Sequence, residues 1–250
     1  MKRTELTAYL NEYLQVGLYK DYAPNGLQVE GSNDITTIVT GVTACQALIA
    51  RAVELNADAL LVHHGFFWKG EPEVLTGMKY RRIKALMDNN INLLGYHLPV
   101  DGHPEIGNNA ELGRKMGMTN AASIEGVAQG LVWQGELVTP ESPEAFAGRL
   151  HHALGRMPVY FGAEVEQIKR VAWCTGGAQD YIDIAVNAGA DAFISGEMSE
   201  RTYHSAVEQG IQYFSAGHHA TERYGIKALG EHLATQFGLT HHFVDIDNPV

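Results

Sequence analysis

The sequence predicts an α/β fold of two similar lobes, related by an internal repeat, with a metal site between them at the carboxyl ends of strands. Short apolar runs such as residues 59–62 alternate with segments of helical periodicity, which predicts βαβ units around a mainly parallel sheet. Residues 38–64 align without a gap on residues 171–197, which indicates the repeat. His63 and His64 end one apolar run, and open α/β sheets bind ligands beyond the carboxyl ends of their strands.

Length and composition describe an ordinary globular chain. Its 250 residues are 45% hydrophobic and 19% charged, enough for one large domain or two small ones. A net charge of -11 argues against nucleic-acid binding, although it leaves room for a small anionic substrate in a metal-bearing pocket. No apolar run approaches the length that crosses a membrane, and Cys45 and Cys174 form no CxxC pair. We therefore expect a cytoplasmic protein in a reducing compartment.

The first lobe, residues 1–125, begins with a helix and continues as alternating strands and helices. Apolar residues three and four apart, starting with Leu6, predict helices, whereas continuous apolar runs predict strands buried on both faces. Pro24, Asn25 and Gly26 predict a turn before a short strand. In chain order we expect helices at 4–14, 45–55, 79–89 and 108–116, and strands at 27–29, 35–42, 58–63 and 91–96.

The second lobe, residues 126–250, follows a change of pattern near residue 120. We expect strands at 131–138 and 158–161 and a helix at 143–154. The repeated strand–helix–strand segment comes next, and residues 220–233 are compatible with a helix. We place His63, His64 and Asp101 in the first lobe, and His218 and Glu222 in the second.

The two halves also share the way in which a buried strand ends. Each strand is followed by a histidine and, four residues later, an acid: His97 and Asp101 in the first half, His218 and Glu222 in the second. Any two βαβαβ segments show some likeness, but these endings favour a true duplication whose strand ends face each other. The identical aligned pairs are Gln46/Gln179, Ile49/Ile182, Ala52/Ala185, Val53/Val186, Ala57/Ala190, Asp58/Asp191 and Ala59/Ala192.

The residues at these strand ends are typical metal ligands. The i, i+4 spacing puts His218 and Glu222 on one helix face, whereas Pro99 interrupts the helical pattern before Asp101 and predicts a strand-to-loop turn there. Imidazole and carboxylate without thiolate suit iron, zinc, manganese, cobalt or nickel, and the number of ligands suits two metals bridged by a carboxylate. The collected candidates are His63, His64, His97, Asp101, His218, His219 and Glu222.

Adjacent histidines are a weak signal by themselves, because this chain has several such pairs. We expect the pair at 151–152, on a helix tail, and the pair at 241–242, near the C-terminus, to be surface residues. The spacing alone leaves two interpretations of His63, His64, His218 and Glu222, either a metal site or polar residues of a pocket.

Five motifs occur in an order that resembles a known family. The segments are 21–31 (DYAPNGLQVEG), 61–65 (LVHHG), 97–101 (HLPVD), 195–197 (SGE) and 217–222 (GHHATE). Together they resemble the GTP cyclohydrolase 1 type 2 family, also called the Nif-three-like dinuclear-metal proteins, and the bacterial YbgI-type members most. The resemblance spans nearly the whole chain.

The resemblance implies two α/β lobes, a two-metal centre between them and a ring-shaped, toroidal homohexamer. The implied ligands of the two divalent ions are His63, His64, Asp101, His218 and Glu222, with Glu222 as the bridge. His97 matches a histidine beside the site, for which we expect a catalytic role in proton transfer. Glu197, at the repeat position of His64, and His204 are candidates for substrate binding, with helix capping or surface exposure as the alternative.

The resemblance further implies a hydrolase that opens the ring of a purine nucleotide, with a metal-bound hydroxide attacking guanine C8. Nothing in the sequence identifies the nucleotide, since it contains neither a Walker A loop nor a G-x-G-x-x-G element. The basic segment 79–84 could contact a phosphate tail or be an ordinary solvated helix face. Two alternatives stay open, namely a non-enzymatic metal-binding ring or scaffold, and a two-metal phosphoesterase or amidohydrolase with another small substrate.

Overall fold

The computed structural model describes residues 1–250, which form two compact units with one β-sheet each. Unit 1 comprises Met1–Val100 and Gly225–Asp247, and unit 2 comprises Asp101–Tyr224 and Asn248–Val250. The predicted lobes, 1–125 and 126–250, have a different boundary, because the chain leaves unit 1 inside helix α4 (Leu98–Gly102) and returns to it inside helix α9 (His218–Phe237). Asp101 therefore belongs to unit 2.

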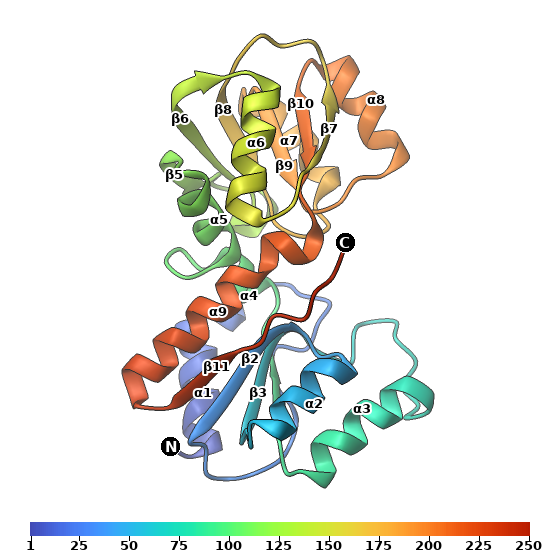
Figure 1. The fold of residues 1–250 in the computed structure, drawn as a ribbon, viewed down its shortest axis with the longest axis vertical. Coiled ribbons are helices and arrows are strands. Elements are labelled where there is room, and N and C mark those ends of the chain that lie inside the picture. The colour runs from blue at the N-terminus through green and yellow to red at the C-terminus, as the bar shows by residue number, and fades with distance from the viewer. The chain divides into compact units, whose positions relative to one another are not determined.

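The sheet of unit 1 has the strand order β1-β4-β3-β2-β11, in which only β1 runs antiparallel to its neighbour. The central residues of β2 and β3 are buried, as expected of strands covered on both faces. Helices α2 and α3 lie side by side against this sheet (Figure 1). The bounds are α1 Arg3–Tyr13, β1 Gly26–Val29, β2 Thr37–Thr43, α2 Gln46–Glu54, β3 Ala59–His64, α3 Gly77–Asp88, β4 Asn92–Gly95 and β11 Thr240–Phe243.

The sheet of unit 2 has the order β5-β6-β8-β9-β10-β7, with a parallel centre of β8, β9 and β10. Helix α6 covers one face of it (Figure 1), where the ring of Phe146 meets that of Phe214 on β10 edge-on at 5.1 Å. The bounds are α5 Asn108–Met116, β5 Thr119–Ser123, β6 Trp133–Glu141, α6 Pro143–Leu154, β7 Val159–Gly162, β8 Ile168–Trp173, α7 Ile182–Asn187, β9 Ala192–Ser195, α8 Glu200–Gln209 and β10 Gln212–Ser215. Short 3-10 turns lie at Val16–Leu18, Ala128–Gly130 and Gln179–Tyr181.

The internal repeat is visible in the strand register. Ile38 pairs with Ala59 in the first sheet, and Val171 with Ala192 in the second, which are equivalent positions in the sequence alignment. In both sheets the next strand, β4 or β10, is parallel, and it is followed by an antiparallel edge strand, β1 or β7. The two sheets thus share four strands of equal order and direction, and the predicted α/β fold with two similar halves is confirmed.

One pair of identical residues in the alignment explains part of this shared register. Asp58 Oδ2 accepts hydrogen bonds from the backbone N–H groups of residues 36 and 37, at 2.8 and 2.9 Å. Asp191 Oδ2 accepts the equivalent bonds from residues 169 and 170, at 2.9 and 2.7 Å. Each aspartate therefore fixes the start of the strand before its own, at the end opposite the candidate ligands.

Two local expectations were wrong, and two strands were not predicted. Pro99 does not prevent a helix, because it lies in the first turn of α4, where a missing N–H group costs no hydrogen bond. The pair His241–His242 is not at a free surface, since it lies partly buried in β11. Strands β5 and β11 have short, mostly polar sequences that gave no apolar run.

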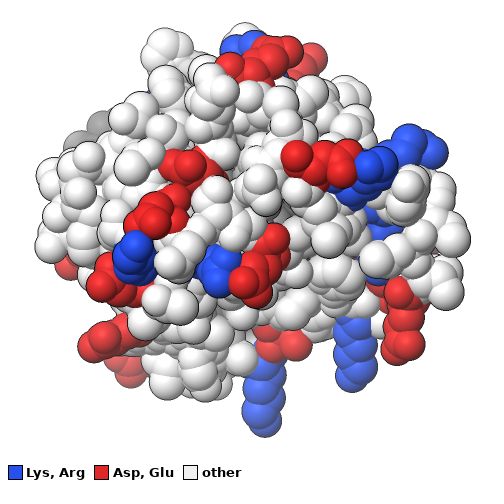
Figure 2. All heavy atoms as spheres, turned by 90° about the horizontal axis from the view of Figure 1, so that it is seen from below, with Lys and Arg blue, Asp and Glu red and all other residues white.

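The surface carries charged side chains of both signs. On the face shown in Figure 2, lysine and arginine side chains are interspersed with aspartate and glutamate. On helix α3, Lys79 pairs with Glu71 and Lys84 with Asp88, at 3.1 and 2.6 Å. None of the helices combines the length and apolar character needed to cross a membrane.

Candidate functional site

Unit 1 contains a cluster of three histidines at the carboxyl edge of its sheet. His63 and His64 end β3, and His97 follows β4, its parallel neighbour, so the two strands bring the three rings to one edge. One ring nitrogen of each histidine lies within 4.8 Å of one from each of the other two, and His63 and His97 are buried. These three histidines could hold a metal ion.

The local structure orients each ring of this cluster through its Nδ1 atom. His63 Nδ1 lies 3.1 Å from the backbone carbonyl O of Tyr96, which fixes Nδ1 as the donor and leaves Nε2 to act as a ligand. His64 Nδ1 lies 3.1 Å from Thr43 Oγ1. Contacts of this kind are what hold metal-binding histidines in the correct tautomer.

The third ring is held by a buried carboxylate that the sequence analysis did not single out. Asp21 Oδ1 lies 2.9 Å from His97 Nδ1, and the same carboxylate accepts hydrogen bonds from Asn25 Nδ2 and from the backbone N–H groups of Ala23 and Leu98. Burial alone would raise the pKa of Asp21, but its contacts with His97 and the other donors hold that pKa well below its usual value. The motif 21–31 therefore contributes an anion that orients His97.

Unit 2 contains a second group of candidate ligands, built around the start of α9. His218 Nε2 lies 3.1 Å from Glu222 Oε2, as the i, i+4 spacing predicts. His218 Nδ1 lies 2.7 Å from Glu197 Oε1, so Glu197 supports the ring of His218. A carboxylate oxygen of Asp101 lies within 4.8 Å of one of Glu222, and Asp101 also accepts a hydrogen bond from Asn108 Nδ2 at 2.8 Å.

The two carboxylates also set the charge of His218. Burial alone would lower its pKa, but the hydrogen bonds and negative charges of Glu222 and Glu197 raise the pKa of His218 to about 9. Because a metal binds only the neutral imidazole, a cation bound at Nε2 would replace this proton. The carboxylates thus supply negative charge at the position where a cation would bind.

Glycines of unit 2 make room for these side chains. Gly176 has φ +71°, and a Cβ atom there would lie 2.0 Å from Glu222 Oε1 and 3.2 Å from His218 Nε2. A Cβ on Gly196 would lie 2.6 Å from the Cα atom of His218. The backbone therefore approaches the ligands as closely as only glycine allows. Gly196 belongs to the motif SGE at 195–197, which the sequence analysis noted, whereas no sequence pattern pointed to Gly176.

The remaining candidates lie elsewhere or have other contacts. His204 is exposed on α8, where it pairs with Glu200 at 3.4 Å, so its predicted role in substrate binding stays a prediction. His219 is buried, and its backbone N–H donates to the carbonyl O of Val250 at 3.0 Å. The pair 151–152 is exposed on α6, as predicted.

The donor chemistry in both units fits a divalent transition metal. Every candidate offers an imidazole nitrogen or a carboxylate oxygen, and most of them are buried. Burial, together with the negative charges of Asp101 and Glu222, raises the pKa of the Cys174 thiol well above its usual value. No cysteine belongs to the groups of candidate ligands, which offer nitrogen and oxygen donors alone.

Comparisons with known proteins point to one family. The family model described as Duf34/NIF3 (NGG1p interacting factor 3) matches residues 1–249. The protein named GTP cyclohydrolase 1 type 2 homolog from Vibrio cholerae is 55% identical over 252 residues and covers 100% of both chains. A solved structure titled as protein ybgI, of unknown function, superposes with a TM-score of 0.96 at 53% identity and covers 100% of both chains. A structure from Thermus thermophilus has a TM-score of 0.89 at 31% identity, with 100% of both chains covered.

Proposed function

This chain belongs to the Duf34/NIF3 family, and we propose that it is a hydrolase that depends on two divalent metal ions and opens the ring of a purine nucleotide. The proposed ligands are His63, His64, Asp101, His218 and Glu222, with Glu222 as the bridging carboxylate. Two of the proposed ligands, His63 and His64, belong to unit 1, and the other three belong to unit 2.

One observation supports this proposal above the others. His63 and His218 are both candidate ligands, and each is held at Nδ1 by an oxygen acceptor of its own unit, at 3.1 and 2.7 Å. A histidine that binds a metal through Nε2 requires its tautomer to be fixed, and a contact at Nδ1 of this kind fixes it. In the internal repeat His218 corresponds to His97, whose Nδ1 is likewise held by a carboxylate, that of Asp21 at 2.9 Å.

Metal ions in such a site lower the pKa of a water molecule and stabilise negative charge that develops on the substrate. His97 would supply the proton transfer. Since its Nδ1 is held by Asp21, Nε2 is the atom that accepts a proton from one reactant and returns it to another. The carboxylate of Asp21 stabilises the positive charge that the ring carries between these two events.

The substrate class rests on the names of relatives. Several bacterial relatives, more than half identical to this chain, are named GTP cyclohydrolase 1 type 2 homolog. We extend that name to this chain as a proposal, together with the homohexameric assembly that the resemblance implies. Light scattering coupled to size-exclusion chromatography tests the assembly, and a monomer of 27.4 kDa would contradict it.

The first experiment measures metal per chain by elemental analysis. We expect close to two metal ions per chain in the wild-type protein and a sharp loss in Glu222→Ala, because that change removes the bridging carboxylate. Glu200→Ala is the matched control, since Glu200 is an exposed glutamate on α8. A wild-type protein without transition metal, even after reconstitution, would rule out the proposed centre.

A second measurement tests catalysis. His97→Ala should keep its metal, and its rate of opening the guanine ring of GTP should fall by roughly 100-fold or more. This is the usual contribution of a general acid or base. If wild-type protein loaded with metal leaves GTP unchanged, the metal site stands and the proposed substrate is wrong.

A further inference from the structure

The histidine cluster of unit 1 is continued by two aromatic side chains. The ring centroids of Tyr22 and Trp68 lie 5.2 and 5.1 Å from that of His97, and 5.5 Å from each other. Trp68 also lies 5.8 Å from His64. With His63, whose ring lies 5.1 Å from that of His97, five rings form a continuous aromatic wall.

This wall runs from the solvent to the candidate ligands. Tyr22 is 55% exposed and Trp68 is partly buried, whereas His97 is 5% and His63 only 1% exposed. Aromatic faces favour stacking with other flat rings, and about half of the Tyr22 side chain is open to such a contact. The exposed end of the wall therefore offers a stacking surface next to the proposed ligands.

The wall is also fixed in place, as a binding surface requires. The backbone N–H of Lys69 donates to the carbonyl O of Tyr22 at 2.8 Å and ties together the two loops that carry the aromatic rings. Trp68 Nε1 donates to the carbonyl O of Gly65 at 3.2 Å. Asp21, which precedes Tyr22, holds His97 at 2.9 Å, so the loop that presents Tyr22 also positions the proton-transfer residue.

We propose that Tyr22 and Trp68 form the stacking surface that receives a planar heteroaromatic ring at the mouth of this site. The inference rests on the proposed function, because it gives the ring of the substrate a place beside His97. Neither residue touches the reacting atoms. Both act by binding and orienting the ring, and a substrate that lacks a flat ring gains nothing from them.

Isothermal titration calorimetry with two probes tests this inference. Guanosine 5′-monophosphate carries the ring, while ribose 5-phosphate offers the same sugar and phosphate without it. We expect wild-type protein to prefer the nucleotide by roughly tenfold or more, in line with the usual strength of stacking between a base and an aromatic side chain. Trp68→Leu and Tyr22→Leu should each remove most of that preference, and Trp68→Phe should keep it.

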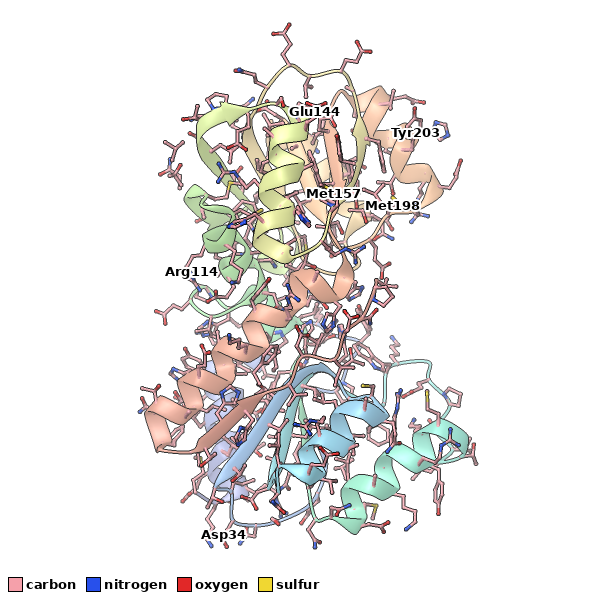
Figure 3. The ribbon with its side chains drawn as sticks, viewed as in Figure 1. Asp34, Arg114, Glu144, Met157, Met198 and Tyr203 are labelled. Atoms are coloured by element: carbon pink, nitrogen blue, oxygen red, sulfur yellow. The ribbon has the colours of Figure 1, made fainter.

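Tyr203→Leu is the matched control, because Tyr203 is a tyrosine of similar exposure that projects from α8 in unit 2 (Figure 3). It should bind both probes as the wild-type protein does. Tyr22→Leu changes an exposed side chain and should fold even if Trp68→Leu does not. Equal affinity for both probes, failure of guanosine 5′-monophosphate to bind, or an unchanged preference in Tyr22→Leu would each overturn the inference.

Metal analysis of the same samples separates this inference from the proposed function. A metal-loaded protein without preference for the nucleotide overturns the stacking surface and leaves the metal centre intact. A protein that contains no metal and still prefers the nucleotide overturns the metal centre and supports the stacking surface.

Discussion

At the scale of single residues, the carboxylates that hold histidine rings are as informative as the histidines themselves. We expect Glu197→Gln to weaken metal binding by roughly 10- to 100-fold, because its contact with His218 fixes the orientation and basicity of a proposed ligand. Asp21→Asn should keep its metal and lose turnover instead, because Asp21 holds the proton-transfer residue His97. Competition with a chelating dye measures the affinity. Glu200→Gln, on the exposed face of α8, is the control. Unchanged metal affinity in Glu197→Gln, or weakened metal affinity in Asp21→Asn, would contradict these two assignments.

A second prediction at this scale concerns His241, which is not one of the proposed ligands. Burial, followed by the positive charges of His242 and Lys227, lowers the pKa of His241 to about 4. In the unfolded chain its pKa is about 6.5, so the unfolded state binds the proton more tightly. The contribution of the neutral His241 to the free energy of unfolding is therefore fully present above pH 6.5. It falls as the pH drops below that value and levels off below about 4.

Urea unfolding at pH 7.5 and 4.5 checks this sign. Gln at position 241 can keep a hydrogen bond to Thr40, which now lies 2.7 Å from His241 Nε2. Allowing for solvent screening, we expect the wild-type protein to lose about 1–2 kcal/mol more than His241→Gln over this interval. His151→Gln, an exposed histidine on α6, should behave as the wild type. Equal losses in wild type and His241→Gln would contradict the assignment.

At the scale of elements, the turn after β8 tests whether the close approach of backbone to ligand matters. Gly176 and Gly210 have nearly the same φ, +71° and +74°, but a Cβ would meet Glu222 at the first position and nothing within 4 Å at the second. Alanine at either position should cost about 1 kcal/mol of stability through the backbone. Only Gly176→Ala should also lose metal. Equal metal content in the two variants would mean that the loop can move aside.

Elements with strong periodicity were predictable from the sequence, and α5 and α6 begin and end where the pattern placed them. The misses have physical causes. Residues 240–243 form strand β11 because they pair with β2, which is about 200 residues away in the sequence. A local sequence pattern cannot show such a pairing. The unit boundary lies inside two helices, so no linker composition marks it. In the candidate site, residue type and spacing singled out the proposed ligands, whereas Asp21 and Gly176 approach these side chains through long-range contacts that only the fold reveals.

At the scale of the whole molecule, the proposed ligands link stability to metal. A metal ion that binds only the folded chain stabilises it by about 2.7 kcal/mol at a free concentration one hundred times the dissociation constant. For a chain of this size, that corresponds to a rise of roughly 5–10 °C in melting temperature. Removing the metal with a chelator should therefore lower the melting temperature by that amount, and adding metal back should restore it.

The proposed division of ligands also predicts how the molecule melts. If three ligands come from unit 2 and two from unit 1, a bound centre couples the unfolding of both units. Calorimetry should then show one transition for the metal-loaded protein, and a broader or double transition after chelation. The variant Glu222→Ala should melt like the chelated protein with or without added metal. A single, unshifted transition under all of these conditions would mean that the two units do not share a metal centre.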